Sequence, residues 1–266
     1  MSSPTYAISA TPWLLVDDFE RKALSKWTNV DTQNDTAPFV ANPQITDIRS
    51  EGANQFLIKK PAKDGLVGNR KALSIIALPQ TVWVGEVSTF FTQIAVERFP
   101  NNHAFGLSNL NVEDILKHDY NAFEPTLRVT DKYESNGFKN DGTLMVKIDS
   151  DDKYRQYDKI QNYDSNTPAE PLKTAYWYNI WFVVNNKTLI EDGQTFDVYM
   201  LGGEFTEQTL VFKNARFRMK RELPLTHFFA TCNTGPMNKP YGNGGLAYDN
   251  IYMSKGINLS TPVEIK

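Results

Sequence analysis

Five side chains in this sequence have the chemistry to bind a carboxylate and to move a proton beside it. His103 and His227 can act as general bases, because an imidazole titrates close to neutral pH. Arg128 lies between two apolar residues in "EPTLRVTD", so it points to the polar face of a strand and can hold a carboxylate by charge-assisted hydrogen bonds. Tyr120 and Tyr133 are the alternative bases.

Together these residue types supply what a β-eliminating polysaccharide lyase needs. One group must neutralise the carboxylate of a uronic sugar, which suits arginine or asparagine, and a base must remove the C5 proton, which suits histidine or tyrosine. The competing interpretation for each histidine is an ordinary structural role. Neither His103 nor His227 has a partner at a metal-ligand spacing, which argues against zinc.

A second set of polar and aromatic residues alternates along "WYNIWFVVNN". Trp177, Asn179 and Trp181 share one face of the expected strand, opposite four apolar residues. Exposed tryptophans on a sheet stack against sugar rings, and a neighbouring asparagine can bond the hydroxyls. The alternative is that this face packs inside the protein.

Acidic residues near both ends of the chain suggest a calcium site. "VDDFE" supplies Asp17 and Asp18, and Asp249 follows the glycine-rich stretch "GPMNKPYGNGG" on an alternating strand with Ile251 and Met253. An inward carboxylate at a sheet end, close to glycine carbonyls, suits a structural Ca²⁺ ion. The alternative is a carboxylate bonded to backbone N–H groups. The run "DSDDK" at 149–153 is interpreted as a solvated turn.

Composition narrows the function classes. The 266 residues carry a net charge of −3 with mixed signs, which gives no sign of a nucleic-acid partner. A single cysteine excludes an internal disulfide, and no apolar run has the ~20 residues of a membrane span. The start lacks a signal-peptide pattern. We expect a monomeric mature form of a secreted or periplasmic protein with an added methionine.

The elements that must position these residues are strands. Period-two alternation recurs in "STFFTQIAVERF", "WYNIWFVVNN", "THFFATCN" and several shorter runs, separated by turn residues. One short helix is predicted within 111–123, and 162–171 is predicted to be a long loop. We therefore expect an all-β fold: one domain over residues 1–266, a two-sheet antiparallel jelly roll with a concave sheet and less than about a tenth helix, against the usual ~30–35%.

Three segments together resemble the concanavalin A-like lectin/glucanase superfamily, especially its LamG-like bacterial members. They are "LLVDDFE…LSKW", "YWYNIWFVVNN…FDVYM" and "GGLAYDNIYMSKGINLSTP". The resemblance implies one jelly roll over most of the chain and helps the calcium interpretation. It does not choose an activity. The E-x-D-x-E pattern of glucanases is absent, and "RFRMKREL" departs from the R-x-E-x-R pattern of alginate lyases.

The sequence thus leaves three functions open. The first is a lyase that cleaves an acidic polysaccharide by β-elimination. A non-catalytic carbohydrate-binding module or lectin is the second, and a structural or adhesive domain is the third. Chain length favours an enzyme, because binding modules are usually shorter. The segments 101–123 and 133–141 are the expected walls of a cleft.

Overall fold

The structure, a computed structural model, describes residues 11–21, 23–134, 136–148 and 157–263. Its larger sheet has eight antiparallel strands, with β1 paired to β17 beside the main path. In spatial order the strands are β15 (Phe205–Arg216), β14 (Thr195–Gly202), β13 (Trp177–Asn185), β6 (Val87–Val96), β17 (Leu246–Lys255), β4 (Asn54–Lys60) and β3 (Ile45–Glu51), with β1 at Leu14–Asp17.

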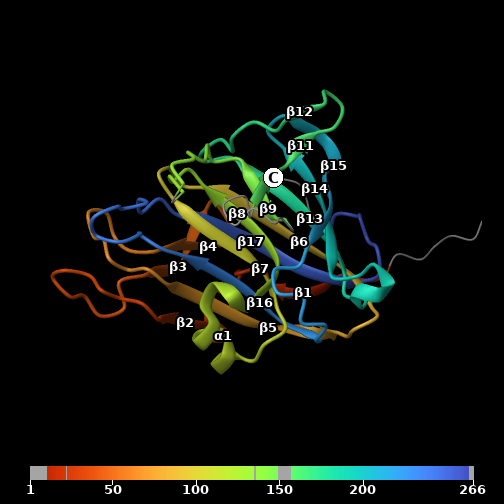
Figure 1. Cartoon of the computed structure of the whole chain (residues 1–266), viewed down its shortest axis with the longest axis horizontal. Coiled ribbons are helices and arrows are strands. Elements are labelled where there is room, and N and C mark those ends of the chain that lie inside the picture. The colour runs from red at the N-terminus through yellow and green to blue at the C-terminus, as the bar shows by residue number, and fades with distance from the viewer. Residues whose placement is uncertain (1–10, 22, 135, 149–156, 264–266) are drawn as a thin grey trace, which may run out of the picture.

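The second sheet has seven antiparallel strands and lies against the first (Figure 1). Its order is β10 (Tyr157–Lys159), β9 (Leu144–Lys147), β8 (Phe123–Thr130), β7 (Asn102–Ser108), β16 (Leu225–Cys232), β5 (Ala72–Val82) and β2 (Thr28–Asp31). Both sheets combine strands from the two halves of the sequence. This arrangement confirms the predicted all-β, two-sheet jelly roll.

Helix is scarce among the described residues. The helix α1 (Val112–His118) begins where the sequence predicted, because the Asn111 side chain accepts the backbone N–H of Asp114. Two 3₁₀ helices follow in the chain, η1 (Asp119–Ala122) and η2 (Leu189–Glu191). The predicted loop at 162–171 instead carries part of a small hairpin of β11 (Gln161–Asn162) and β12 (Thr167–Pro168).

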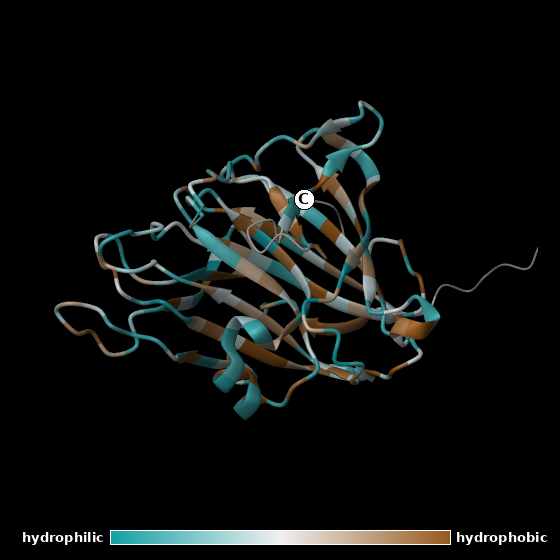
Figure 2. Cartoon of the chain, viewed as in Figure 1, coloured by the Kyte–Doolittle hydropathy of each residue, from teal (hydrophilic) through white to brown (hydrophobic). Residues whose placement is uncertain are grey.

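The main core fills the space between the two sheets. Phe105 on β7 meets Tyr248 on β17 edge to face, with ring centroids 5.6 Å apart, and both residues are fully buried. A smaller cluster lies on the outer face of the seven-stranded sheet, where Ile115 of α1 packs on Leu73 and Phe229. Figure 2 shows the resulting pattern, with hydrophobic residues concentrated on the strands and hydrophilic ones in most loops.

The strand β17 corrects the predicted orientation of Asp249. Its pairing with β6 shifts register between Asp249 and Tyr252, and Asn250 has a φ of 52°. One extra residue therefore interrupts the alternation. Tyr248 and Ile251 both belong to the core between the sheets, so Asp249 does not share a face with Ile251 as strict alternation predicted.

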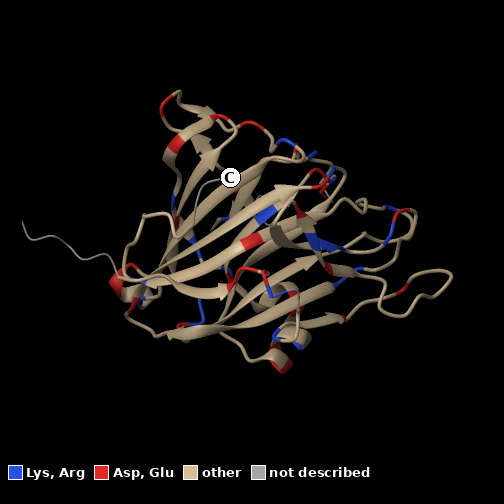
Figure 3. Ribbon diagram, turned by 180° about the vertical axis from the view of Figure 1, so that it is seen from behind, with Lys and Arg blue, Asp and Glu red and all other residues tan. Residues whose placement is uncertain are grey.

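Charges of both signs are interspersed over the molecule (Figure 3), in keeping with the small net charge of −3. Within the described part of the chain, no helix is long and apolar enough to cross a membrane.

Candidate functional site

A pocket opens on the seven-stranded sheet, on the same side as η1. We call it the cleft. The residues that matter for its chemistry are Lys71, Asn102, Tyr120, Arg128, Lys132, Glu134, Tyr157 and Tyr241. Three of them are basic and one is acidic, in a protein whose net charge is −3. The cleft is therefore locally cationic and suits an anionic ligand.

Strand register places Arg128 in the cleft. Ala104 on β7 pairs with Arg128 on one side and with Thr231 on the other, so the three side chains share the outer face of the sheet. The neighbours of Arg128 along β8, Leu127 and Val129, belong to the core between the sheets. The predicted alternation around Arg128 is thus what the structure shows.

Two tyrosines form the centre of the cleft. Tyr157 Oη donates a hydrogen bond to Tyr120 Oη at 2.6 Å. Arg128 lies over the Tyr157 ring at 5.0 Å, while Arg218 and Lys71 lie over the Tyr120 ring at 4.7 and 5.6 Å. Three cations therefore surround the tyrosine pair. Burial and the neighbouring Tyr120 raise the pKa of Tyr157 well above its ordinary value, so this phenol keeps its proton at neutral pH.

Glu134 balances part of the positive charge. Its carboxylate lies 2.8 Å from Arg128 Nη1 and 2.8 Å from Lys132 Nζ, so two cations share one anion. Burial raises the pKa of Glu134, but Arg128 and Lys132 outweigh burial and lower the pKa below its ordinary value. Arg128 also donates to Asn102 Oδ1 at 3.1 Å, which fixes the plane of the guanidinium.

Lys71 has an environment that suits a base. It is half-buried and directly precedes β5, on the same face as Leu73. Burial lowers the pKa of Lys71. The Asp119 carboxylate raises this pKa, but the positive charges of Arg218 and Arg70 lower it further. The pKa of Lys71 therefore lies below its ordinary value. A lysine with a lowered pKa is neutral more often and can accept a proton.

Only one of the two histidines, His103, is among the residues that line the cleft, so the predicted polar face does not gather both. His103 pairs with Val129 and Cys232, which places its ring toward the core, where Nε2 contacts the Gly244 carbonyl at 2.8 Å. Burial lowers the pKa of His103 to about 4. His227 is absent from the cleft lining, and its Nδ1 contacts Thr226 Oγ1 at 2.9 Å.

The two candidate tyrosines also differ in position. Tyr120 lies in the cleft, whereas Tyr133 is 55% exposed and does not line it, although both of its neighbours in the chain do. The Lys139 ammonium lies 5.0 Å above the Tyr133 ring. The two predicted wall segments, 101–123 and 133–141, contribute Tyr120 and Glu134 respectively.

The expected sugar-stacking set lies on the other sheet. Trp177, Asn179 and Trp181 belong to β13 of the eight-stranded sheet, so they do not share a face with Arg128. Trp181 is fully buried against Phe91, and its Nε1 donates to the Ser260 carbonyl. Trp181 therefore packs inside the protein, as the alternative interpretation predicted.

The rest of that set is also engaged within the protein. Asn179 is buried and accepts a hydrogen bond from Gln93 at 2.8 Å. Trp177 is half-buried, packs edge to face on Phe56 and bonds Glu51 at 3.3 Å. These contacts are structural.

The predicted calcium ligands have N–H partners. Asp249 is fully buried, and its two oxygens accept from the Asn250 backbone and the Asn54 side chain at 2.8 and 3.0 Å. Asp17 accepts from the Phe19 backbone and from Trp27 Nε1. Asp18 accepts from the Glu20 backbone.

Calcium takes about six to eight oxygen ligands. No group of three or more His, Cys, Asp and Glu residues that could hold a metal ion occurs in the ranges that the structure describes. The N–H bonds account for these carboxylates without an ion, and the donor set does not fit calcium. The run 149–153 lies outside the described residues.

Sequence reasoning missed Lys71, Lys132, Tyr157 and Arg218. Lys71 had a usable signal, because it lies two residues before Leu73 at the start of an alternating strand. Arg218 belongs to "RFRMKREL", which matches the R-x-E-x-R pattern only in part. The remaining two lie in polar stretches without alternation, so no local pattern points to them.

No protein-family model matches the sequence, and no curated protein sequence matches it. Solved structures do resemble the fold. The marine PL-14 alginate lyase from Aplysia kurodai is 11% identical, covers 93% of this chain and 100% of its own, and gives a TM-score of 0.54.

Two other solved structures give lower scores. The lectin from Bauhinia forficata in complex with GalNAc is 8% identical over 93% of this chain and 99% of its own, with a TM-score of 0.47. Alginate lyase vAL-1 from Chlorella virus is 10% identical over 91% and 100%, also at 0.47. The likeness to the Aplysia protein shows the fold alone, a two-sheet jelly roll, as the sequence resemblance implied.

Proposed function

We propose that the protein is a polysaccharide lyase that binds a uronic polysaccharide in the cleft and cleaves it by β-elimination, outside the cytoplasm. The observation that carries the proposal is the tyrosine pair surrounded by Lys71, Arg128 and Arg218 in a protein of net negative charge. The similar structure from Aplysia kurodai, an alginate lyase, supports the same class of reaction.

Arg128 and Lys132 neutralise the carboxylate of the sugar that reacts. Both cations contact Glu134, so together they keep one net positive charge for a ligand. A carboxylate that loses its negative charge to these groups makes the C5 proton beside it more acidic. The hydrogen bonds to Glu134 and Asn102 hold the guanidinium in place before the substrate arrives.

Lys71 acts as the base that removes the C5 proton. The electron pair released from that bond forms the C4–C5 double bond, and the bond from C4 to the glycosidic oxygen breaks. Lys71 replaces the two histidines in this role. His103 lines the cleft, but its Nε2 contacts the Gly244 carbonyl and burial lowers its pKa to about 4, while His227 lies outside the cleft lining.

Tyr120 donates the proton that the leaving glycosidic oxygen needs. Tyr157 donates its hydrogen bond to the Tyr120 oxygen, so the proton of Tyr120 is available to the cleft. The same hydrogen bond, with Lys71 and Arg218 near the ring, stabilises the negative charge that Tyr120 gains as it gives up its proton.

Arg128→Gln tests the carboxylate contact. A hydrogen bond to a charged group contributes about 1.5–3 kcal/mol, so we expect roughly tenfold to a hundredfold weaker binding of a uronic tetrasaccharide by titration calorimetry. Lys213→Gln, which removes the same charge from an exposed position on β15, is the matched control and should bind normally. If the two variants bind the tetrasaccharide with equal affinity, Arg128 does not contact the ligand.

Calcium binding is tested by chelation. Because N–H donors already occupy the oxygens of Asp249 and Asp17, we expect the melting temperature to be the same with and without EDTA. An ion that binds only the folded state would stabilise it by mass action. A fall in melting temperature with EDTA, absent in Asp249→Asn, would restore the calcium site.

A further inference from the structure

A second basic pocket adjoins the cleft on the other side of Tyr120. Its lining shares Lys71 and Tyr120 with the cleft and adds Arg70, Asn121 and Arg218. Asp119 is its one acidic residue, and the Asp119 carboxylate already accepts a hydrogen bond from Thr32 at 2.5 Å. Three basic side chains thus face one acidic residue of the lining, and one of them, Arg70, also lies 3.9 Å from the Asp35 carboxylate.

Arg218 is held at the boundary of the two pockets. Its Nη2 donates to Asn121 Oδ1 at 2.9 Å, and its Nη1 lies 3.4 Å from Tyr157 Oη. Its guanidinium also lies 4.7 Å from the centre of the Tyr120 ring. Both of these hydrogen-bond acceptors are neutral, so neither cancels the charge of the guanidinium.

The segment that carries Arg218 wraps around the buried carboxylate of Glu124. That carboxylate, at the start of β8, accepts backbone N–H groups from three consecutive residues, Met219, Lys220 and Arg221, at 3.0, 2.8 and 3.3 Å. Lys220 has a φ of 54°, which turns the successive N–H groups toward one point, as in an anion-binding nest.

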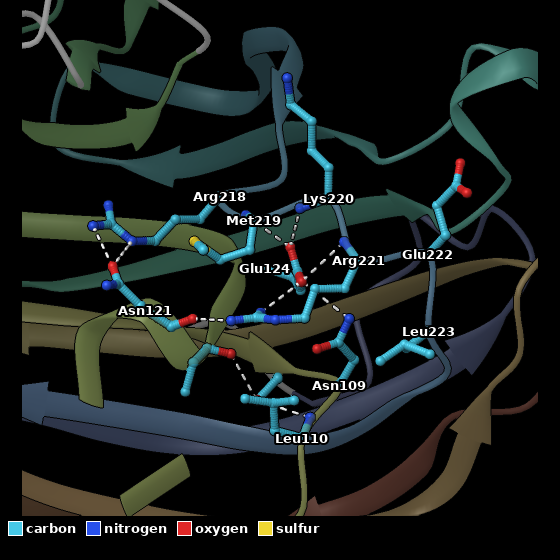
Figure 4. A network of polar contacts seen from close by, with 12 residues as sticks. Asn109, Leu110, Asn121, Glu124, Arg218, Met219, Lys220, Arg221, Glu222 and Leu223 are labelled. Carbon is cyan, nitrogen blue, oxygen red and sulfur yellow. Dashed lines mark hydrogen bonds and ion pairs between the residues drawn. The ribbon is translucent and has the colours of Figure 1, made fainter. Parts of the chain in front are cut away.

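Side chains complete the enclosure of Glu124. Arg221 Nη1 and Asn109 Nδ2 donate to it at 2.8 and 3.0 Å, and Arg221 also donates to the Asn121 carbonyl. Figure 4 shows Glu124 at the centre of these contacts, with Arg218 extending from the segment to Asn121. The carboxylate therefore fixes the backbone from which Arg218 reaches the pocket.

We infer that this second pocket is an anion-binding subsite, which takes the carboxylate of the sugar next to the one that reacts, and that Glu124 positions Arg218 for it. The inference rests on the proposed function and narrows the substrate to chains that carry acidic groups on neighbouring sugars. Arg70 and Arg218 supply the charge, and Asn121 orients Arg218.

Inorganic sulfate is a probe of the subsite that does not depend on turnover. We expect saturable shifts of the backbone amide signals of Lys71, Tyr120 and Arg218 when the full chain is titrated by NMR at constant ionic strength. Arg218→Gln should weaken sulfate binding at least about tenfold, since it removes a charge-assisted contact. Lys213→Gln should bind as the unaltered chain does. Shifts that do not saturate, or equal affinity in Arg218→Gln, would overturn the subsite.

Glu124→Gln tests the positioning role. It should weaken sulfate binding as Arg218→Gln does, and the double variant should be no weaker than Arg218→Gln alone, because both changes remove one interaction. Additive losses would show that Glu124 does not act through Arg218. If Glu124→Gln does not fold, Arg221→Gln, which removes one donor to the same carboxylate, takes its place in the comparison.

A uronic tetrasaccharide separates the subsite from the proposed function. Should the tetrasaccharide fail to bind while sulfate saturates at these amides, the polysaccharide function is wrong and the anion subsite stands. Conversely, tetrasaccharide binding that Arg128→Gln weakens and Arg218→Gln leaves unchanged would support the proposed function and contradict the subsite.

Discussion

Replacing Lys71 by methionine should lower kcat for β-elimination by about 10²–10⁴-fold, the usual contribution of a general base. Methionine preserves much of the length and the apolar stem of lysine but cannot accept a proton. The half-buried side chain just before β5 should therefore keep its packing while the reaction loses its base. Steady-state kinetics on a uronic polysaccharide measure the effect, with Lys213→Met as the matched control.

The pH profile identifies the role more closely. A base works in its neutral form, so kcat of the unaltered protein should rise with pH up to the pKa of Lys71, which burial and the nearby arginines lower. The residual activity of Lys71→Met should lack that rise. If the variant retains kcat within threefold of the original, or shows the same rise, Lys71 is not the base.

Trp181→Ala should lower the free energy of unfolding by about 3–5 kcal/mol, the range for removing a large aromatic from a core. Trp181 is fully buried against Phe91, and its indole N–H bonds the Ser260 carbonyl, so the change leaves a cavity and an unpaired carbonyl. Urea denaturation measures the loss. Trp177→Ala, at a half-buried position on the same strand, should cost less.

The same variant decides between two roles for β13. If Trp181 stacked on sugar, its replacement would weaken glycan binding and leave stability nearly unchanged. We expect the opposite, because β13 and the cleft belong to different sheets. Glycan affinity measured well below the denaturation midpoint should stay within about twofold of the original, which is less than 0.5 kcal/mol.

Local patterns predicted the strands well, because alternation along a strand depends only on which face is buried. The alternation in β13 and β6 and the N-cap of α1 at Asn111 are examples. What lies on the outer face of a strand depends instead on distant segments. The residue that caps the Trp181 indole is Ser260, which lies 79 positions away in the chain.

The site itself depends on sheet order and on breaks in alternation. Arg128 reaches the cleft through its pairing with Ala104, and Lys71 and Arg218 approach Tyr120 from different parts of the chain. The face of Asp249 was predicted wrongly because of a bulge in β17. One extra residue there moves the side chains that follow it in the strand to the opposite face of the sheet. Neither the order of the strands nor the position of the bulge can be predicted from the pattern of neighbouring residues.

The most direct test of the account is the ultraviolet absorbance of the conjugated double bond that β-elimination creates at the new non-reducing end. The unaltered chain, incubated with a panel of uronic polysaccharides, should produce a steady rise with at least one of them, and Lys71→Met at equal concentration should produce almost none. Tight binding with no rise for any uronic polysaccharide would contradict the lyase function and leave a carbohydrate-binding protein. A rise that Lys71→Met retains in full would place the chemistry outside the proposed site.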